Sequence, residues 1–414
     1  MEPKRHFQAS SLLKWWTRTP LVTRILGGLV IGAVLGLVCP QWTGIGILGH
    51  VFVNALKAIA PVLVMLLVAS SIAKAHGGLG DRFKTVITFY LLSTFVAAVV
   101  AVVGSFLFPV SIRLQGVGEG SAAGPGGLAD VFTTLLTNMV MNPVQALASA
   151  NYIGILFWAL VIGAGLKLLA SEGTVKVVSD LADVVSQVVK WVIQFAPFGI
   201  LGLVFSSVAE SGLNIFVDYG KLILLLVGCM VFTSAVVNPF IAWLHLRKNP
   251  YPLYWKCLKK SGLNAFFTRS SAANIPINMD LCEELGLDDE FYSVSIPLGS
   301  TINMNGAAVT ISVLSLAVAH TVGVEVSLLS ALFLCLVSTL GACGASGVAG
   351  GSLLLVPMAC SFFGIGNDIA MQAVAVGFII GVVQDSVETA LNSSGDVFFT
   401  AVAEFHDRKK KAKA

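Results

Sequence analysis

Long apolar runs are the feature of this sequence that most limits what the chain can fold into. A helix needs about 20 residues to cross the roughly 30 Å hydrocarbon core of a bilayer, and eight runs are of about that length or longer. They are Leu21 to Cys39, Ile45 to Ile72, Val86 to Val110, Tyr152 to Leu169, Val188 to Val208, Leu222 to Leu244, Val294 to Ala319 and Met371 to Val402. Only 11% of the 414 residues are charged, which is too few to cover a soluble globule. The sequence therefore predicts an all-α polytopic membrane protein with eight transmembrane helices.

The distribution of Lys and Arg predicts how these spans are oriented. Basic residues cluster before the first span, after the second, after the sixth and after the last, whereas the loop after the first has none. Cytoplasmic loops carry the excess of positive charge, so an even number of spans places both termini in the cytoplasm. No cleavage pattern follows the first run, and we expect a multi-pass protein of the cell inner membrane, surrounded by lipid. A net charge of +3 is too small to indicate a nucleic-acid partner.

Two further segments do not fit the simple count of spans. Apolar arms at Leu328 to Leu340 and Leu353 to Phe363 flank a tip rich in Gly, Ala and Ser, and neither arm can span alone. A weaker copy, from Leu258 to Pro276, carries the tip Arg269-Ser270-Ser271. Paired interrupted segments of this kind are typical of re-entrant hairpins in transporters, whose tips present backbone N–H groups to anions. Close packing of small residues is the simpler interpretation of the Gly-rich tip alone.

The last span carries an unusual stripe of polar side chains. Asp385, Glu388, Thr389, Asn392 and Asp396 lie on one face at 100° per residue. An acidic group facing lipid costs roughly 2.5–3.5 kcal/mol at the membrane centre, so the stripe must face the protein interior. A structural polar seam, or a helix end already in water, remains the alternative to a functional site.

The seventh span is interrupted at Gly299 to Gly306. Gly and Asn weaken a helix and can leave carbonyl oxygens free to coordinate sodium. The amides of Asn303 and Asn392 and the carboxylate of Asp396 add oxygen ligands of the kind that hard cations prefer. Taken alone, the interruption could also be a packing kink.

In this order, the motifs resemble those of the dicarboxylate/amino-acid:cation symporters of the glutamate-transporter fold. The similarity covers nearly the whole chain and is greatest to the bacterial sodium-coupled serine/threonine branch. It implies two re-entrant hairpins with inverted repeats, a homotrimer, and a transport domain that moves against a scaffold like an elevator. The implied scaffold covers 1–81 and 111–215. The implied transport domain comprises the third span at 82–110, the sixth span at 216–250, the first hairpin at 251–285, the broken span at 286–324, the second hairpin at 325–366 and the last span at 367–404. A basic cytoplasmic tail follows at 405–414.

The resemblance also implies particular site residues. Ser271 and Asn392 would hold the substrate carboxylate and Asp385 its amino group. Further substrate contacts are implied at Arg269, Val348, Ser352, Glu388 and Thr389. Three sodium sites are implied. The first comprises Gly299, Asn303, Asn392 and Asp396, and the second comprises the carbonyls of Thr301, Ala342, Cys343 and Ala345. The third comprises Tyr90, Ser93, Thr94 and Asn303. At the third site Asn305 replaces the family's aspartate, and the missing charge argues against a cation there.

Two departures from the family pattern indicate the substrate. Members that carry acidic amino acids have an arginine where this chain has Glu388, and a threonine where it has Ala307. A carboxyl group in place of the arginine removes the clamp for a second substrate carboxylate. Glu388 or Thr389 could instead hydrogen-bond a hydroxyl. We therefore expect serine and threonine as substrates, sodium as the coupling ion and no other cofactor.

Three alternatives to a sodium-coupled symporter follow from the same residues. A passive facilitator or ion channel could use the acidic stripe to line its path. A proton-coupled carrier could use Glu388 as its titrating group. An intramembrane hydrolase is the least favoured, because neither Ser270 nor Ser271 has a His or Lys at a motif spacing. We expect no enzymatic activity.

Overall fold

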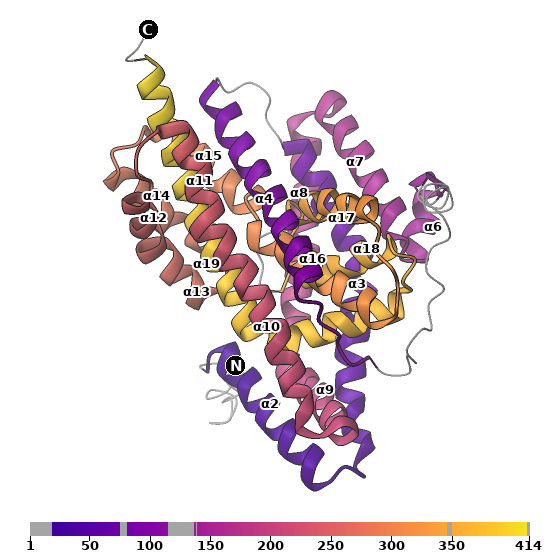
Figure 1. Cartoon of the computed structure of the whole chain (residues 1–414). Helices are drawn as coiled ribbons and strands as arrows, with labels where there is room; N and C mark the ends of the chain where they lie inside the picture. The colour runs from indigo at the N-terminus through magenta and orange to yellow at the C-terminus, as the bar shows by residue number, and fades with distance from the viewer. Residues whose placement is uncertain (1–18, 75–80, 115–135, 138, 346–349, 412–414) are drawn as a thin grey trace, which may run out of the picture.

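The structure, a computed structural model, describes residues 19–74, 81–114, 136–137, 139–345 and 350–411. The described residues are mainly helical (Figure 1). The α-helices are α2 (Leu21–Val38), α3 (Gly46–Lys74), α4 (Asp81–Leu107), α6 (Pro143–Ala148), α7 (Tyr152–Leu169), α8 (Glu172–Gln194), α9 (Ala196–Ser211), α10 (Ile215–Phe232), α11 (Asn238–Leu246), α12 (Tyr251–Cys257), α13 (Leu263–Thr268), α14 (Ile275–Glu284), α15 (Asp289–Ile302), α16 (Asn305–Thr321), α17 (Leu328–Ala342), α18 (Val356–Ser361) and α19 (Asn367–Lys411). The predicted all-α class is confirmed.

The candidate spans agree with most of the predicted runs. In the described part of the chain, six continuous helical stretches are long and apolar enough to cross a membrane, and the bent pair α8 and α9 brings the number to seven. α2 and the hairpin helices α17 and α18 are shorter apolar helices. The count of eight spans therefore stays a prediction.

The fifth predicted span differs from the structure. The run Val188 to Val208 is not one straight helix, because α8 and α9 meet at an angle of 54°. Phe195 lies between them, and Pro197 falls in the first turn of α9. A proline lacks the N–H that would continue α8 and its ring clashes with the preceding turn, so the sequence bends here.

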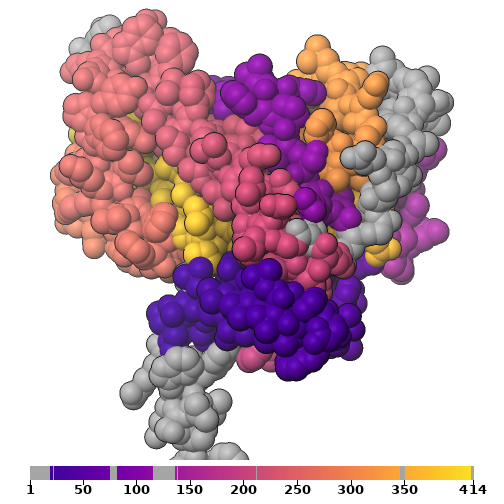
Figure 2. Space-filling view, turned by 60° about the horizontal axis from the view of Figure 1, so that its bottom comes forward, coloured from indigo at the N-terminus to yellow at the C-terminus, as the bar shows by residue number. Residues whose placement is uncertain are grey.

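Three glycines spaced four residues apart form the face of α2 that packs on α9. A Cβ at Gly28 or Gly32 would overlap the backbone carbonyl oxygen of Pro197 or Leu201, and one at Gly36 would lie 2.8 Å from the carbonyl oxygen of Phe205. Small residues at this spacing allow two helices to approach closely in a membrane. In the space-filling view the N-terminal helices form an indigo band across one end of the molecule (Figure 2).

Replacing Gly32 with leucine is expected to destabilise the protein by roughly 1–3 kcal/mol, because the added side chain must push α2 away from α9. Gly27 is the matched control, since no atom of the described residues lies within 4 Å of a Cβ built there. Thermal unfolding of Gly32→Leu and Gly27→Leu in detergent makes the comparison. Equal unfolding temperatures for the two variants would show that the glycine face does not hold α2 in place.

Each predicted hairpin is a pair of helical arms on either side of a turn. In the first, α12 and α13 are joined by a π-helical segment, and Arg269 turns the chain with a left-handed φ of 52° before α14. In the second, α17 and α18 flank a tip that includes residues 346–349, which lie outside the described residues. Figure 1 shows α12 to α14 on one flank of α19, and α16 to α18 on the other.

α19 is the central element, and both the broken helix and the hairpins pack against it. Its 45 residues are buried for most of their length. α15 ends at Ile302 and α16 begins at Asn305, so the interruption predicted in the seventh span is present. In Figure 2 other helices cover much of α19, drawn in yellow, on the face shown. The polar stripe of α19 therefore faces protein, as the cost of exposing it to lipid requires.

A group of ionised side chains ties α4, α15 and α19 together at the far end of α19. The backbone N–H of Asp288 donates to both carboxylate oxygens of Glu404, each at 3.0 Å. Arg82 donates from Nη1 to Asp288 Oδ2 at 2.7 Å, and this hydrogen bond lowers the pKa of Asp288. Glu404 thus satisfies a donor at the start of α15 that the helix itself cannot satisfy.

Candidate functional site

The candidate site lies where the middle of α19 meets the break between α15 and α16. Asn303 and Met304 leave helical geometry there, so the first N–H groups of α16 have no partner within their own helix. Asn392 supplies one, because its Oδ1 accepts the Gly306 N–H at 2.7 Å. A Cβ at Gly306 would lie 2.8 Å from Glu388 Cα, so glycine is required for this close approach. The break is held open by the side chains of α19 rather than being a kink alone.

Asp385 receives donors from both hairpins. Arg269 Nε donates to its Oδ2 at 2.6 Å, and the Gly350 N–H donates to its Oδ1 at 3.2 Å. The side chains of Arg269 and Asp385 are 11% and 3% exposed, so the pair is well shielded from water. The left-handed turn at Arg269 aims its guanidinium at α19. Asp385, which the sequence predicted to receive an ammonium group, thus already carries a cationic partner in this structure.

Glu388 is held by three hydrogen bonds that all end on one carboxylate oxygen. Thr310 Oγ1, Ser352 Oγ and Gln384 Nε2 donate to Glu388 Oε2 at 2.7, 2.9 and 2.5 Å. Thr310 and Gln384 were missed by the sequence reasoning. Gln384 could have been found, because it lies one helical turn before Glu388 on α19. Thr310 gives no such signal, because it lies in an apolar helix 78 residues away.

Two buried oxygen atoms at the break have no hydrogen-bond donor in the described part of the chain. Asn303 Nδ2 donates to Asp396 Oδ1 at 2.9 Å and to the Asn392 carbonyl at 3.1 Å. Among the described residues, Asn303 Oδ1 and Asp396 Oδ2 are buried and unpaired. Leaving a carboxylate oxygen buried without a partner is costly, and carboxylate and amide oxygens are ligands of the kind that sodium accepts. The donor set around Asn303 and Asp396 therefore fits the predicted first cation site, and Gly299 is placed beside it, because a Cβ there would lie 2.9 Å from Asp396 Oδ1.

Most side chains of the third predicted cation site hydrogen-bond to neighbouring side chains. Asn305 Nδ2 donates to Ser93 Oγ at 2.6 Å, and Asn305 Oδ1 accepts from Thr94 Oγ1 at 3.0 Å. Ser93 also donates to Asn238, and the Tyr90 hydroxyl lies 2.9 Å from Thr400 Oγ1. The amide of Asn305 supplies a donor where an aspartate would leave an acceptor. The fourth residue predicted at this site, Asn303, keeps a buried Oδ1 without a donor among the described residues, so the absence of a cation at the third site stays a prediction.

The other predicted residues that the structure describes lie on α19, at the ends of α15 and α17, or just after the turn at Arg269. Thr389 Oγ1 donates to the Asp385 carbonyl at 2.7 Å, so its hydroxyl hydrogen bonds within α19. Ser271 is buried just after the turn at Arg269. Cys343 Sγ lies 3.6 Å from the Ile302 carbonyl, which brings the end of α17, and with it Ala342 and Ala345, to the end of α15 near Thr301. Val348 lies outside the described residues.

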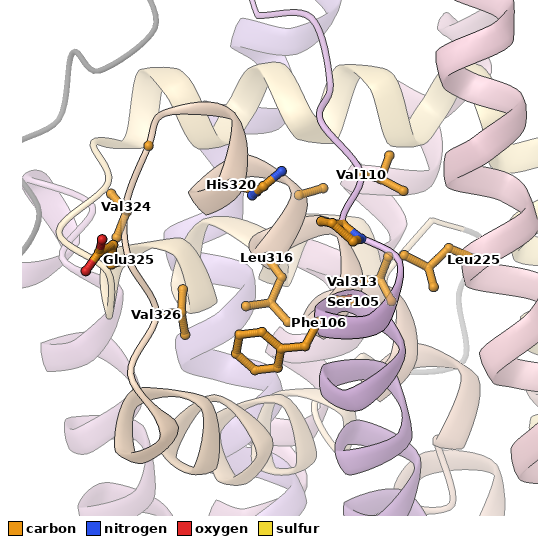
Figure 3. A pocket seen from close by; sticks show the side chains of 13 residues that line it. Ser105, Phe106, Val110, Leu225, Val313, Leu316, His320, Val324, Glu325 and Val326 are labelled. Atoms are coloured by element: carbon orange, nitrogen blue, oxygen red, sulfur yellow. The ribbon is translucent and has the colours of Figure 1, made fainter.

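A hollow of about 640 Å³ lies elsewhere in the molecule (Figure 3). It lies between the end of α4, α10 and the end of α16, and its lining is mainly apolar, with Phe106, Leu316 and Val326 among the side chains. His320 and Glu325 contribute its ionisable groups. None of the predicted site residues lines this hollow, and its apolar walls offer no set of polar groups comparable with that at the α15–α16 break.

Comparison with known proteins gives an independent assignment. The serine/threonine transporter SstT of Streptococcus thermophilus is 57% identical over 395 residues, which are 95% of this chain and 98% of the relative. The serine/threonine transporter SstT of Bifidobacterium adolescentis is 58% identical over 386 residues, 93% and 90% of the two chains. The model of the sodium:dicarboxylate symporter family matches residues 21–405. This match confirms the prediction of a transport protein rather than an enzyme. The chain belongs to the sodium:dicarboxylate symporter family.

Proposed function

We propose that this protein uses the sodium gradient to import serine and threonine. The names of its relatives and of its family support the substrate and the coupling ion. The observation that carries the coupling ion is the pair of buried, unpaired oxygens, Asn303 Oδ1 and Asp396 Oδ2. Carboxylate and amide oxygens that lack a hydrogen-bond donor are ligands of the kind that a hard cation such as sodium prefers.

The substrate site in this proposal is bounded by the two hairpins and α19. The ammonium group of the amino acid binds Asp385 and competes there with Arg269, which occupies the carboxylate in this structure. Ser271, Asn392 and the backbone N–H groups of the tips bind its carboxylate. Glu388 accepts the substrate hydroxyl. An acidic amino acid would bring a second carboxylate against Glu388 and is excluded.

The packing of the helices supports the division into scaffold and transport domain. α2, α3, α7, α8 and α9 pack mainly with one another, whereas α4 and α10 to α19 pack around α19. Lys57 of α3 and Asp368 of α19 form an ion pair between the two groups of helices. We propose that the second group moves as a unit against the first, in a homotrimer in the cell inner membrane with both termini in the cytoplasm.

Uptake of radiolabelled serine into proteoliposomes tests this function. An inward tenfold sodium gradient with a potential of −100 mV supplies about 3.7 kcal/mol per ion, enough for roughly 500-fold accumulation of a neutral amino acid. We expect concentrative uptake that needs sodium and is inhibited by unlabelled threonine but not by aspartate. Vesicles with potassium on both sides are the control.

Other results of the same assay would overturn the proposal in distinct ways. Equilibration of serine without sodium would indicate a passive facilitator. Sodium-independent uptake that collapses with the pH gradient would indicate proton coupling. Inhibition by aspartate would mean that Glu388 does not set the specificity.

A further inference from the structure

We propose that Thr310 and Gln384 are positioning residues that hold the Glu388 carboxylate in the orientation in which it recognises the substrate hydroxyl. This inference rests on the proposed function, because it concerns how serine and threonine are distinguished from amino acids without a hydroxyl. It adds two residues that act through Glu388 and need no contact with the substrate.

Thr310, Gln384 and Glu388 form a closed ring of hydrogen bonds between α16 and α19. Gln384 Nε2 donates both to Thr310 Oγ1, at 2.7 Å, and to Glu388 Oε2, at 2.5 Å. Thr310 Oγ1 in turn donates to Glu388 Oε2 at 2.7 Å. Thr310 and Gln384 are fully buried, and Glu388 is 6% exposed. The ring fixes the carboxylate through two helices that do not depend on the hairpin tips.

The orientation of the Gln384 amide shows that the ring is built around the carboxylate. Its Nε2 donates to two acceptors, while its Oε1 is buried and has no donor among the described residues. An unpaired buried oxygen is unfavourable, and the reverse orientation would place that oxygen against Glu388 Oε2. The two hydrogen bonds that the amide donates to Glu388 and Thr310 therefore hold it in this orientation.

The ring leaves one carboxylate oxygen for a ligand. All three donors that contact Glu388, namely Thr310, Ser352 and Gln384, end on Oε2. Among the described residues no hydrogen bond reaches Oε1. A hydroxyl group of the substrate can donate to Oε1, whereas alanine has no donor there and would leave the oxygen unpaired. Sites built to bind a hydroxyl reject analogues that lack it for this reason.

Substitutions that remove the donors without changing side-chain volume much test the inference. Thr310→Val and Gln384→Met are expected to raise the KM for serine about tenfold in sodium-driven uptake, and to change the inhibition constant of alanine less than twofold. Discrimination between serine and alanine should then fall about tenfold, or 1.4 kcal/mol. Thr310→Ser, which keeps the hydroxyl, should discriminate between serine and alanine as the wild-type protein does.

Ser312→Ala is the matched control on the same helix. The Ser312 hydroxyl is fully buried and donates to Ser338 Oγ at 2.9 Å, away from Glu388. Its loss should change serine and alanine transport by the same factor. The inference fails if Thr310→Val and Gln384→Met also change both amino acids equally, or if Thr310→Ser behaves like Thr310→Val. Failure of the wild-type protein to take up serine with sodium would instead reject the proposed function.

Discussion

Replacing Asp396 with asparagine is expected to abolish sodium-driven serine uptake. In our proposal the Asp396 carboxylate is the charged ligand of the cation, and its Oδ2 has no partner among the residues that the structure describes. Removing one partner of a buried charge pair costs roughly 3–5 kcal/mol, so the apparent sodium affinity should fall about 100-fold or more. The measurements are the sodium dependence of uptake and the sodium-dependent rise in unfolding temperature in detergent, since an ion that binds only the folded state stabilises it.

Asn305 shows why an asparagine should close the site rather than merely weaken it. There the amide nitrogen donates to Ser93 and the amide oxygen accepts from Thr94, so both polar atoms of the amide are used within the protein. An amide at position 396 would likewise put an N–H donor in place of a charged oxygen. Asp280→Asn, which changes an exposed carboxylate of α14, is the control. Sodium stabilisation that survives in Asp396→Asn would contradict the assignment of this cation site.

The parts of the fold that the sequence predicted are those that depend on local pattern. The five polar residues of the last span were placed on one face by helical periodicity, and all five are buried against protein. The break at Asn303 and the turn at Arg269 follow from residues that weaken or end helices. Both signals can be read within about ten residues of chain.

The parts that the sequence did not predict depend on partners far along the chain. The role of the Thr310 hydroxyl depends on its hydrogen bond to Glu388. The role of the α2 glycines depends on their close contact with the backbone of α9. The bend at Phe195 was not predicted, because a hydropathy average over the run does not register Pro197, which cannot continue a straight helix. Arg269 was expected at the tip, but its position on Asp385 follows from the packing of a hairpin against α19.

Replacing Asp385 with asparagine is expected to lower the affinity for serine about 100-fold or more, while sodium still stabilises the protein. An amide cannot neutralise the ammonium group of an amino acid in a site shielded from water, and the lost charge pair again corresponds to roughly 3–5 kcal/mol. Serine uptake and serine-dependent thermal stabilisation measure the loss. Preserved sodium stabilisation separates this variant from Asp396→Asn, since the two carboxylates serve different ligands in the proposed site.

The effect of Asp385→Asn on substrate must be distinguished from its effect on Arg269, whose guanidinium loses its partner in the variant. A buried cation without a counter-ion destabilises the fold. The double variant Arg269→Met/Asp385→Asn removes both charges and should regain thermal stability relative to Asp385→Asn, yet it should still fail to bind serine. Serine binding that returned with stability would mean that Asp385 serves to hold the first hairpin in place, and that the ammonium group is recognised elsewhere.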